Sequence, residues 1–370
     1  MRASASKRLL AWWLRHAGAI RMAGILRRAL RGPRLIVLCY HRVDEDPGKP
    51  ALSATPSEFA RQLDWYACRF DVLPLAKVAG YLAGRETLRR DSVALTFDDG
   101  YADNYHIVLP LLNSRRLPAT YFISTGPLLD RLPYWYDVLW MRLKLWNGKA
   151  PAPDAAAGLP KELVEALDAF ADDPGNSGKA GLQRILDCSK GLDTPTRGLF
   201  LEWLQANQAG SEAVAAPCET MTLAEALDSA RRGIELGGHT RSHPSLARIP
   251  APECRMEILG GLTDLAGAGF DVRFFAYPFG ESMDVGGASG YPHEVLSDLE
   301  RTSSRREAAE PAGPAGPLGP DRVPGVQLAV TTEERAVRPG DDPFLVPRKV
   351  ITPQDLSQIA LKLELLAWRK

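Results

Sequence analysis

The chain has 370 residues, 45% of them hydrophobic, which is enough for one large core with a subdomain or for two modest domains. Lysine plus arginine equals aspartate plus glutamate, so the net charge is zero and gives no sign of a nucleic-acid ligand. The five cysteines have no CxxC spacing, which argues against a disulfide framework and favours a reducing compartment.

Residues 1–34 form a basic segment, since no acidic residue precedes Asp44. A secretory signal needs a longer apolar stretch than Leu9–Leu14, and no run reaches the roughly 20 apolar residues that span a bilayer. Lys7–Arg31 is predicted to be a basic amphipathic helix with four apolar residues roughly on one side: Leu9, Trp13, Ile20 and Leu30. It could lie on an anionic membrane surface or pack its apolar side on the domain.

Short apolar runs rich in β-branched residues then alternate with helical stretches, the pattern of an α/β fold with a parallel sheet. The number of predicted strands is sufficient for a barrel. The strands are Leu35–Tyr40, Val93–Phe97, Ala119–Ser124, Ile234–His239, Phe274–Tyr277, Val326–Thr331 and Phe344–Val350.

Two regions interrupt this alternation and divide the chain. Residues 128–220 are predicted to be a helical insertion, with helices around Leu163–Phe170 and Leu182–Leu204, in a barrel made of residues 35–127 and 221–370. Residues 310–325 are so rich in proline and glycine that a mobile loop is predicted. Aromatic residues of the insertion could stack on sugar rings or form a small core of their own: Tyr134, Trp135, Tyr136, Trp140 and Trp146.

Two adjacent carboxylates, Asp98 and Asp99, end the predicted strand Val93–Phe97 and are followed by Gly100. Active-site groups collect at the carboxyl ends of parallel strands, although an aspartate there can also cap the following helix. A second polar cluster, His239-Thr-Arg-Ser-His243, follows another predicted strand. Histidines at i and i+4 face the same side of a helical turn, and with one aspartate they form a ligand set that leaves positions open for water and substrate.

These motifs resemble the polysaccharide deacetylases of the NodB-homology type, carbohydrate esterase family 4. The residues that carry the resemblance are, in the family's order, Thr96-Phe-Asp-Asp-Gly100, His239-Thr-Arg-Ser-His243 and Phe275-Ala-Tyr-Pro-Phe-Gly280. The resemblance covers about Leu35–Gly126 and Met221–Val350. It implies a distorted (β/α) barrel of about seven strands with the site at the carboxyl-end face.

The resemblance also implies roles for individual residues. Asp98 would be the general base, and a divalent metal, usually zinc in this family, would be held by Asp99, His239 and His243. The turn at Tyr277, Pro278 and Phe279 would contact substrate, and the Phe279 backbone N–H would stabilise the oxyanion. Such a turn could also be a tight corner without a catalytic task.

The chain departs from the family pattern at two places. Ala276 stands where relatives commonly have an arginine that orients the base, and Arg348 is the candidate replacement, unless it only forms a surface ion pair. The Leu-x-His segment that supplies a general acid in many relatives is also missing. His41 is the candidate acid or sugar-binding group, or else a buried structural histidine, whereas His293 is predicted to be a solvated surface group.

The Tyr-His sequence at His41 resembles the branch that acts on exopolysaccharide amino sugars, so the expected substrate is an N-acetylated carbohydrate. The alternatives are an O-acetyl esterase or small-molecule amidohydrolase on the same scaffold, and a non-catalytic glycan-binding relative. A cytoplasmic location, at the inner membrane face, would reconcile the basic helix with the cysteine content.

Overall fold

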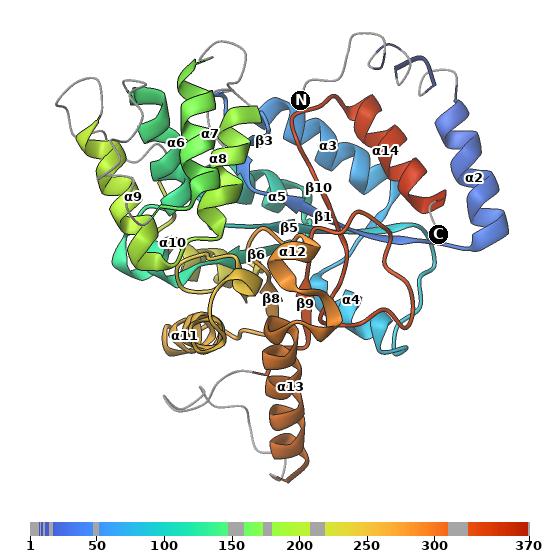
Figure 1. The fold of residues 1–370 in the computed structure, drawn as a ribbon. Helices are drawn as coiled ribbons and strands as arrows, with labels where there is room; N and C mark the ends of the chain where they lie inside the picture. The colour runs from blue at the N-terminus through green and yellow to red at the C-terminus, as the bar shows by residue number, and fades with distance from the viewer. Residues whose placement is uncertain are drawn as a thin grey trace.

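A nearly closed barrel of parallel strands forms the centre of the computed structural model, which describes residues 7, 9, 12–14, 18–46, 52–146, 159–172, 180–207, 219–309 and 325–368. The strand order is β10–β1–β5–β6–β7–β8–β9, with the short β4 beside β5 (Figure 1). A parallel bridge between Val330 at the end of one outer strand and Val346, just before the other, brings the two edges together, so the sheet nearly closes on itself.

The seven barrel strands correspond to the seven predicted ones to within a few residues at their ends, which confirms the predicted distorted barrel. They are β1 (Leu35–Tyr40), β5 (Ser92–Phe97), β6 (Thr120–Ile123), β7 (Glu235–Gly238), β8 (Phe274–Ala276), β9 (Leu328–Val330) and β10 (Arg348–Val350). Three further strands are too short for their sequence pattern to reveal them: β2 (Arg42–Val43), β3 (Leu52–Ala54) and β4 (Asp71–Val72).

Helices pack around the outside of this barrel. Those of the barrel region are α3 (Pro56–Arg69), α4 (Leu75–Leu82), α5 (Leu109–Arg115), α10 (Leu223–Arg231), α11 (Ala251–Gly267), α12 (Ser282–Val285), α13 (Tyr291–Ala309) and α14 (Leu356–Trp368). Capping boxes start α3 and α10, where Thr55 pairs with Glu58 and Thr222 with Glu225. A π-helical turn, Asn104–Val108, leads into α5.

Side chains along β1 alternate between two hydrophobic clusters, as the period of two requires. Ile36, Leu38 and Tyr40 face the outer cluster beneath the helices, whereas Leu35 and Val37 join the inner one. The inner layer is tightly packed: a Cβ on Gly237 would come within 2.9 Å of the backbone oxygen of Phe274. Only glycine fits at that position of β7.

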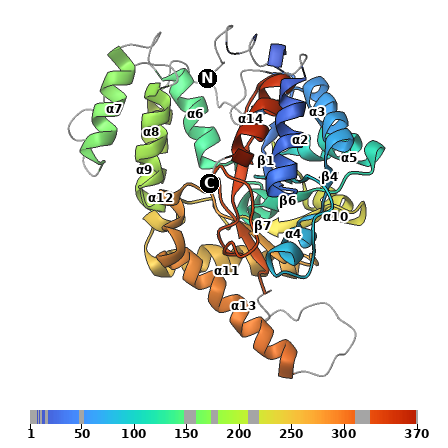
Figure 2. The same ribbon diagram turned by 90° about the vertical axis from the view of Figure 1, so that its right-hand side faces the viewer.

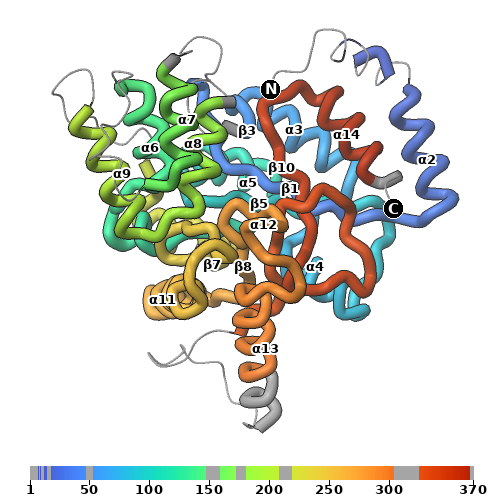
Figure 3. The backbone as a smooth tube through the Cα atoms, viewed as in Figure 1, coloured from blue at the N-terminus to red at the C-terminus, as the bar shows by residue number. Residues whose placement is uncertain are grey.

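The described part of the predicted helical insertion contains four helices, which lie together beside the barrel (Figures 2 and 3) and have a hydrophobic core of their own. These helices are α6 (Trp135–Leu145), α7 (Lys161–Asp172), α8 (Ala180–Lys190) and α9 (Thr194–Ala206). The predicted stretch Leu182–Leu204 is two helices, because Asp193 caps a new helix by accepting a hydrogen bond from the Thr196 N–H. The residue limits predicted for the insertion stay a prediction.

The basic amino-terminal segment differs from the prediction of one helix over Lys7–Arg31. Gly18, at φ 75°, precedes a separate helix, α2 (Ala19–Arg31). Ile20 is partly buried while Leu30 is 67% exposed, so these two residues do not share a side. Among the described residues no helix is long and apolar enough to cross a bilayer. The loop predicted at 310–325 lies almost wholly outside the described residues.

Candidate active site

The two adjacent carboxylates point to different neighbours because the backbone turns sharply between them. The Asp98 N–H still donates to the Tyr40 carbonyl in the β-ladder, at 2.9 Å. Asp99 then adopts φ 73°, a left-handed conformation that few residues other than glycine tolerate. The Tyr134 hydroxyl fixes this turn by donating to the Asp99 carbonyl oxygen at 2.5 Å. Backbone strain of this kind is concentrated at functional sites.

Asp98 lies inside the barrel mouth, where both terminal nitrogens of the Arg348 guanidinium bind its carboxylate. Arg348 Nη1 and Nη2 each donate to an Asp98 oxygen at 2.7 Å, and Arg348 is fully buried. Burial alone would raise the pKa of Asp98, but Arg348 outweighs it, and the pKa lies below its usual range. Asp98 is therefore ionised and fixed in orientation. The sequence placed Arg348 near the end of a strand, whereas it is the first residue of β10 and its long side chain reaches Asp98.

Asp99, His239 and His243 converge on one point, and we refer to them as the Asp/His/His cluster. Asp99 Oδ1 lies 3.4 Å from His239 Nε2 and 3.3 Å from His243 Nε2. His239 Nδ1 lies 2.7 Å from the Ala276 carbonyl oxygen. A carbonyl can only accept, so Nδ1 carries the proton and Nε2 presents a lone pair to the cluster.

The helical turn predicted for His239–His243 is wrong. This segment is a loop in which Thr240 and His243 have φ of 66° and 59°. The Ser124 hydroxyl donates to the His239 carbonyl, and the His243 N–H donates to Thr240 Oγ1. The two rings nevertheless reach the same Asp99 oxygen, because the loop folds back on itself.

The donor atoms of the Asp/His/His cluster suit a divalent cation. Asp99 Oδ1 is buried and has no hydrogen bond of ordinary geometry within the described residues. Burial would raise the pKa of Asp99, but His239 and His243 lower it well below its usual range. Burial also lowers the pKa of His243, so its imidazole is neutral at neutral pH. Asp99 and His243 are therefore in the protonation states that metal binding requires.

The turn after β8 lies beside this cluster. Phe279 has φ 62°, and its ring centroid is 4.7 Å from that of His243. The turn is anchored to the neighbouring strand, since the Thr332 hydroxyl donates to the Phe279 carbonyl. Tyr277 and Pro278 are buried, and the Tyr277 ring packs on Phe275 in the outer cluster. A substrate-binding role for these two residues and the oxyanion role of Phe279 stay predictions.

The insertion forms one wall of the site, a contact that the sequence did not specify. Trp135 Nε1 donates to the His243 carbonyl oxygen at 3.1 Å, and the Tyr136 ring centroid lies 4.9 Å from that of His243. Lys190, from α8, places its ammonium 4.4 Å from the centre of the Phe279 ring. Trp146 instead belongs to the core of the insertion. The predicted aromatic stretch is thus divided between the site and a separate core.

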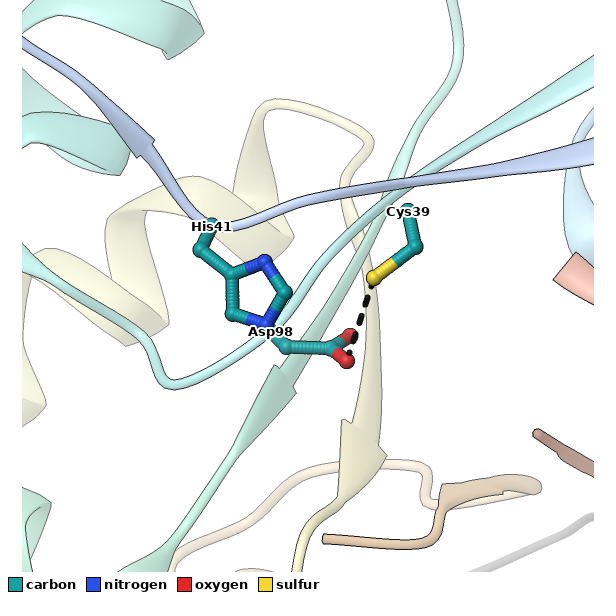
Figure 4. Close-up of side chains that lie close together, drawn as sticks. All are labelled: Cys39, His41 and Asp98. Carbon is teal, nitrogen blue, oxygen red and sulfur yellow. Dashed lines mark hydrogen bonds between the residues drawn. The ribbon is translucent and has the colours of Figure 1, made fainter. Parts of the chain in front are cut away.

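His41 lies close to Asp98, on the side of the barrel mouth formed by β1. Figure 4 shows Cys39, His41 and Asp98 directed toward a common space. Their potential ligand atoms all lie within 4.8 Å of one another. The Cys39 thiol donates to Asp98 Oδ2 at 3.4 Å, and burial raises its pKa well above the usual range. Cys39 is thus a neutral donor to Asp98, a contact that the sequence did not predict.

The remaining histidines lie apart from this site or outside the described residues. His293 Nε2 is 2.8 Å from Asp342, and its side chain is only 14% exposed, so the prediction of a solvated surface group is wrong. His106 is 60% exposed beside Glu225 on the surface. His16 lies outside the described residues.

Comparisons with known proteins support the barrel fold. Residues 85–139 match the sequence profile described as polysaccharide deacetylase. No curated protein is detectably similar in sequence. The structure of IcaB from Ammonifex degensii is 20% identical, with a TM-score of 0.52 over 91% of this chain and 98% of that one. The Streptococcus pyogenes deacetylase PplD, solved with acetate, is 16% identical, with a TM-score of 0.52 over 90% of this chain and 97% of that one.

Zinc added to the metal-free protein is expected to raise its thermal unfolding midpoint. An ion that binds only the folded state adds about 2.7 kcal/mol of stability at a concentration of about one hundred times its Kd. Asp99→Asn should abolish the shift, because it removes the negative charge that Asp99 contributes to the Asp/His/His cluster. His106→Ala, which changes a surface histidine, should keep the full shift. A full shift in Asp99→Asn would place the bound zinc elsewhere.

Proposed function

We propose that this chain, whose residues 85–139 match the polysaccharide deacetylase profile, removes N-acetyl groups from an amino-sugar polysaccharide or a glycan precursor with the help of a divalent metal. One observation carries the proposal. A single turn separates a carboxylate fixed by Arg348 from a second carboxylate that faces two histidines. Hydrolysis of an unactivated amide needs both a proton acceptor and a means of stabilising negative charge, and this turn supplies a group for each.

Asp99, His239 and His243 are the residues that would hold the metal, for which zinc is the first choice. A cation bound there would lower the pKa of a water molecule and polarise the acetamide carbonyl. The chain's own contribution is to present three donor atoms from two neighbouring loops. His239 is kept in the required tautomer by the Ala276 carbonyl.

Asp98 would accept the proton of the attacking water. A carboxylate with a lowered pKa is a weak base. Asp98 would therefore contribute to the reaction because it is held in position and stays ionised. Arg348 donates to both Asp98 oxygens and Cys39 donates to Oδ2 as well, so the remaining lone pair of Oδ1 would receive the proton. The Phe279 backbone N–H would donate to the oxyanion, and His41 would give a proton to the leaving amine.

Two other activities use the same groups. An O-acetyl esterase needs the same base and oxyanion donor but a less demanding leaving group, and a small-molecule amidohydrolase differs only in the pocket. A non-catalytic glycan binder is disfavoured, since binding alone gives no reason to bury a carboxylate and a guanidinium that cost free energy to desolvate. The location at an inner membrane face stays a prediction.

Purified protein with zinc is expected to release acetate from N-acetylglucosamine oligomers. A chelator should abolish the release, and Asp98→Ala and Asp98→Asn should lower the turnover about 10²–10⁴-fold, because both remove the proton acceptor. Coupled enzymatic detection of acetate measures this. Zinc-loaded protein that releases acetate only from O-acetylated or small acylated substrates would replace the proposal with one of its alternatives.

Arg348→Lys is expected to lower kcat about a hundredfold with unchanged zinc binding, since one ammonium cannot hold both oxygens of Asp98 in place. Arg348→Met should in addition cost about 3–5 kcal/mol of folding stability, because Asp98 would be buried without its partner. Lys349→Arg, on the same strand, serves as the control and should retain kcat. Steady-state kinetics with zinc-loaded proteins decide the matter, and an unaltered kcat in Arg348→Lys would exclude a positioning role.

His41→Ala separates a proton donor from a structural histidine. Loss of the acid should lower turnover of N-acetyl substrates about 10²–10⁴-fold. It should leave hydrolysis of para-nitrophenyl acetate nearly unchanged, because that leaving group departs without a proton. Both rates are measured on the same zinc-loaded preparation. Equal losses on the two substrates would point to a structural role, and full turnover on both would exclude any role in the reaction.

A further inference from the structure

Helix α2 presents its apolar side to solvent instead of to the protein. Its large apolar residues Met22, Ile25, Leu26 and Leu30 are 55 to 67% exposed, and we call them the α2 apolar face. They recur at three- and four-residue spacing, so they lie on one side of the helix. Leu365 of the neighbouring α14 is 55% exposed as well. This is the reverse of the orientation that a helix on a globular domain normally adopts.

Buried ion pairs hold the helix in this orientation. Arg27, 1% exposed, pairs with Asp91 at 2.5 Å and with Glu364 at 3.3 Å. Arg34 pairs with the same two carboxylates, at 3.4 and 2.8 Å. A Cβ at Gly24 would lie 3.2 Å from the Glu364 carboxylate, so the glycine permits this close approach. Turning the apolar face inward would break these pairs, and the exposed orientation is therefore built into the fold.

The charges around the α2 apolar face are positive. Arg21 and Arg28 are exposed on the same helix, and Lys7 is exposed further toward the amino terminus. No acidic residue precedes Asp44. Trp12 and Trp13 are 51 and 59% exposed in the preceding segment. Exposed aliphatic residues with nearby tryptophans and basic side chains match the interface of an anionic bilayer, which has an acyl layer beneath negative headgroups.

We propose that the α2 apolar face docks this protein on the surface of an anionic lipid bilayer. Met22, Ile25, Leu26 and Leu30 enter the boundary between headgroups and acyl chains, and Lys7 and Arg21 bind lipid phosphates. A protein partner with a complementary groove would need acidic residues to match the basic side chains, and a second copy of this helix would bring like charges together. An anionic bilayer supplies both a continuous apolar layer and negative charge without such a requirement.

This docking directs the candidate active site away from the lipid. Asp91, which binds Arg27, precedes β5, whereas Asp98 follows the end of β5, about 20 Å further on. Figures 1 and 2 place α2 and α14 on the side of the barrel away from the insertion helices α6–α9 that wall the site. The bound protein therefore receives substrate from the aqueous side.

Flotation with vesicles of phosphatidylcholine, with and without phosphatidylglycerol, tests the proposal. The full chain should float only with the anionic vesicles. Ile25→Asp/Leu26→Asp should lower the bound fraction at least about tenfold, because charge is forced into the apolar layer. Lys7→Gln/Arg21→Gln should weaken binding about fivefold for each charge removed.

The matched controls carry the same substitutions elsewhere on the surface. Leu199→Asp/Met256→Asp changes two residues that are 66 and 65% exposed, and it should keep wild-type binding. Lys161→Gln/Arg184→Gln removes two exposed charges from the insertion and should also have no effect. Circular dichroism confirms that each variant is folded.

Three outcomes would overturn the proposal. They are the absence of binding to anionic vesicles, equal binding to neutral vesicles, and binding that survives Ile25→Asp/Leu26→Asp. A dimer in analytical ultracentrifugation that this double substitution dissolves would assign the face to a second copy and also refute the bilayer. Acetate release from soluble oligomers is independent of these results, so failure here leaves the proposed function untouched.

Discussion

The buried pair of Arg348 and Asp98 is the interaction around which the barrel mouth is organised. A guanidinium removed from water costs several kcal/mol unless its donors are satisfied. Here they are used by Asp98, by the Thr96 hydroxyl and by the Thr331 carbonyl. The side chains inside the barrel therefore change from aliphatic to polar around Arg348. The strand ends there must supply oxygen atoms that accept its hydrogen bonds.

Conformational strain at the site is the second consequence of this arrangement. Four residues other than glycine have left-handed backbone there: Asp99, Thr240, His243 and Phe279. Each costs of the order of 1–3 kcal/mol, which the surrounding structure must offset. Hydrogen bonds from Tyr134, Trp135 and Thr332 to the carbonyls of this region provide the compensation. Two of these three donors belong to the segment of the predicted insertion, so that segment stabilises the site that it covers.

The sequence predicted those features that depend on local pattern or on an ordered motif. Strand positions followed from apolar runs, and the grouping of Asp99 with His239 and His243 followed from the resemblance to the polysaccharide deacetylases. The shape of the His239–His243 segment did not follow, because two histidines four residues apart can share a ligand site either in a helical turn or in a loop. Here the left-handed Thr240 and His243 make it a loop. The role of α6 as a wall of the site also lay beyond reach, since nothing local distinguishes Trp135, which meets His243, from Trp146, which meets Phe170.

The position of Arg348 has a consequence for the newly made chain. Asp98 and its partner are 250 residues apart in the sequence, and β10 follows all the other strands of the described residues. Until β10 emerges from the ribosome, β1 lacks one of its two neighbours and the Asp98 carboxylate lacks its counterion. An unpaired strand edge of this kind invites aggregation. A partly synthesised barrel without β10 would thus be prone to aggregate until this strand pairs with β1.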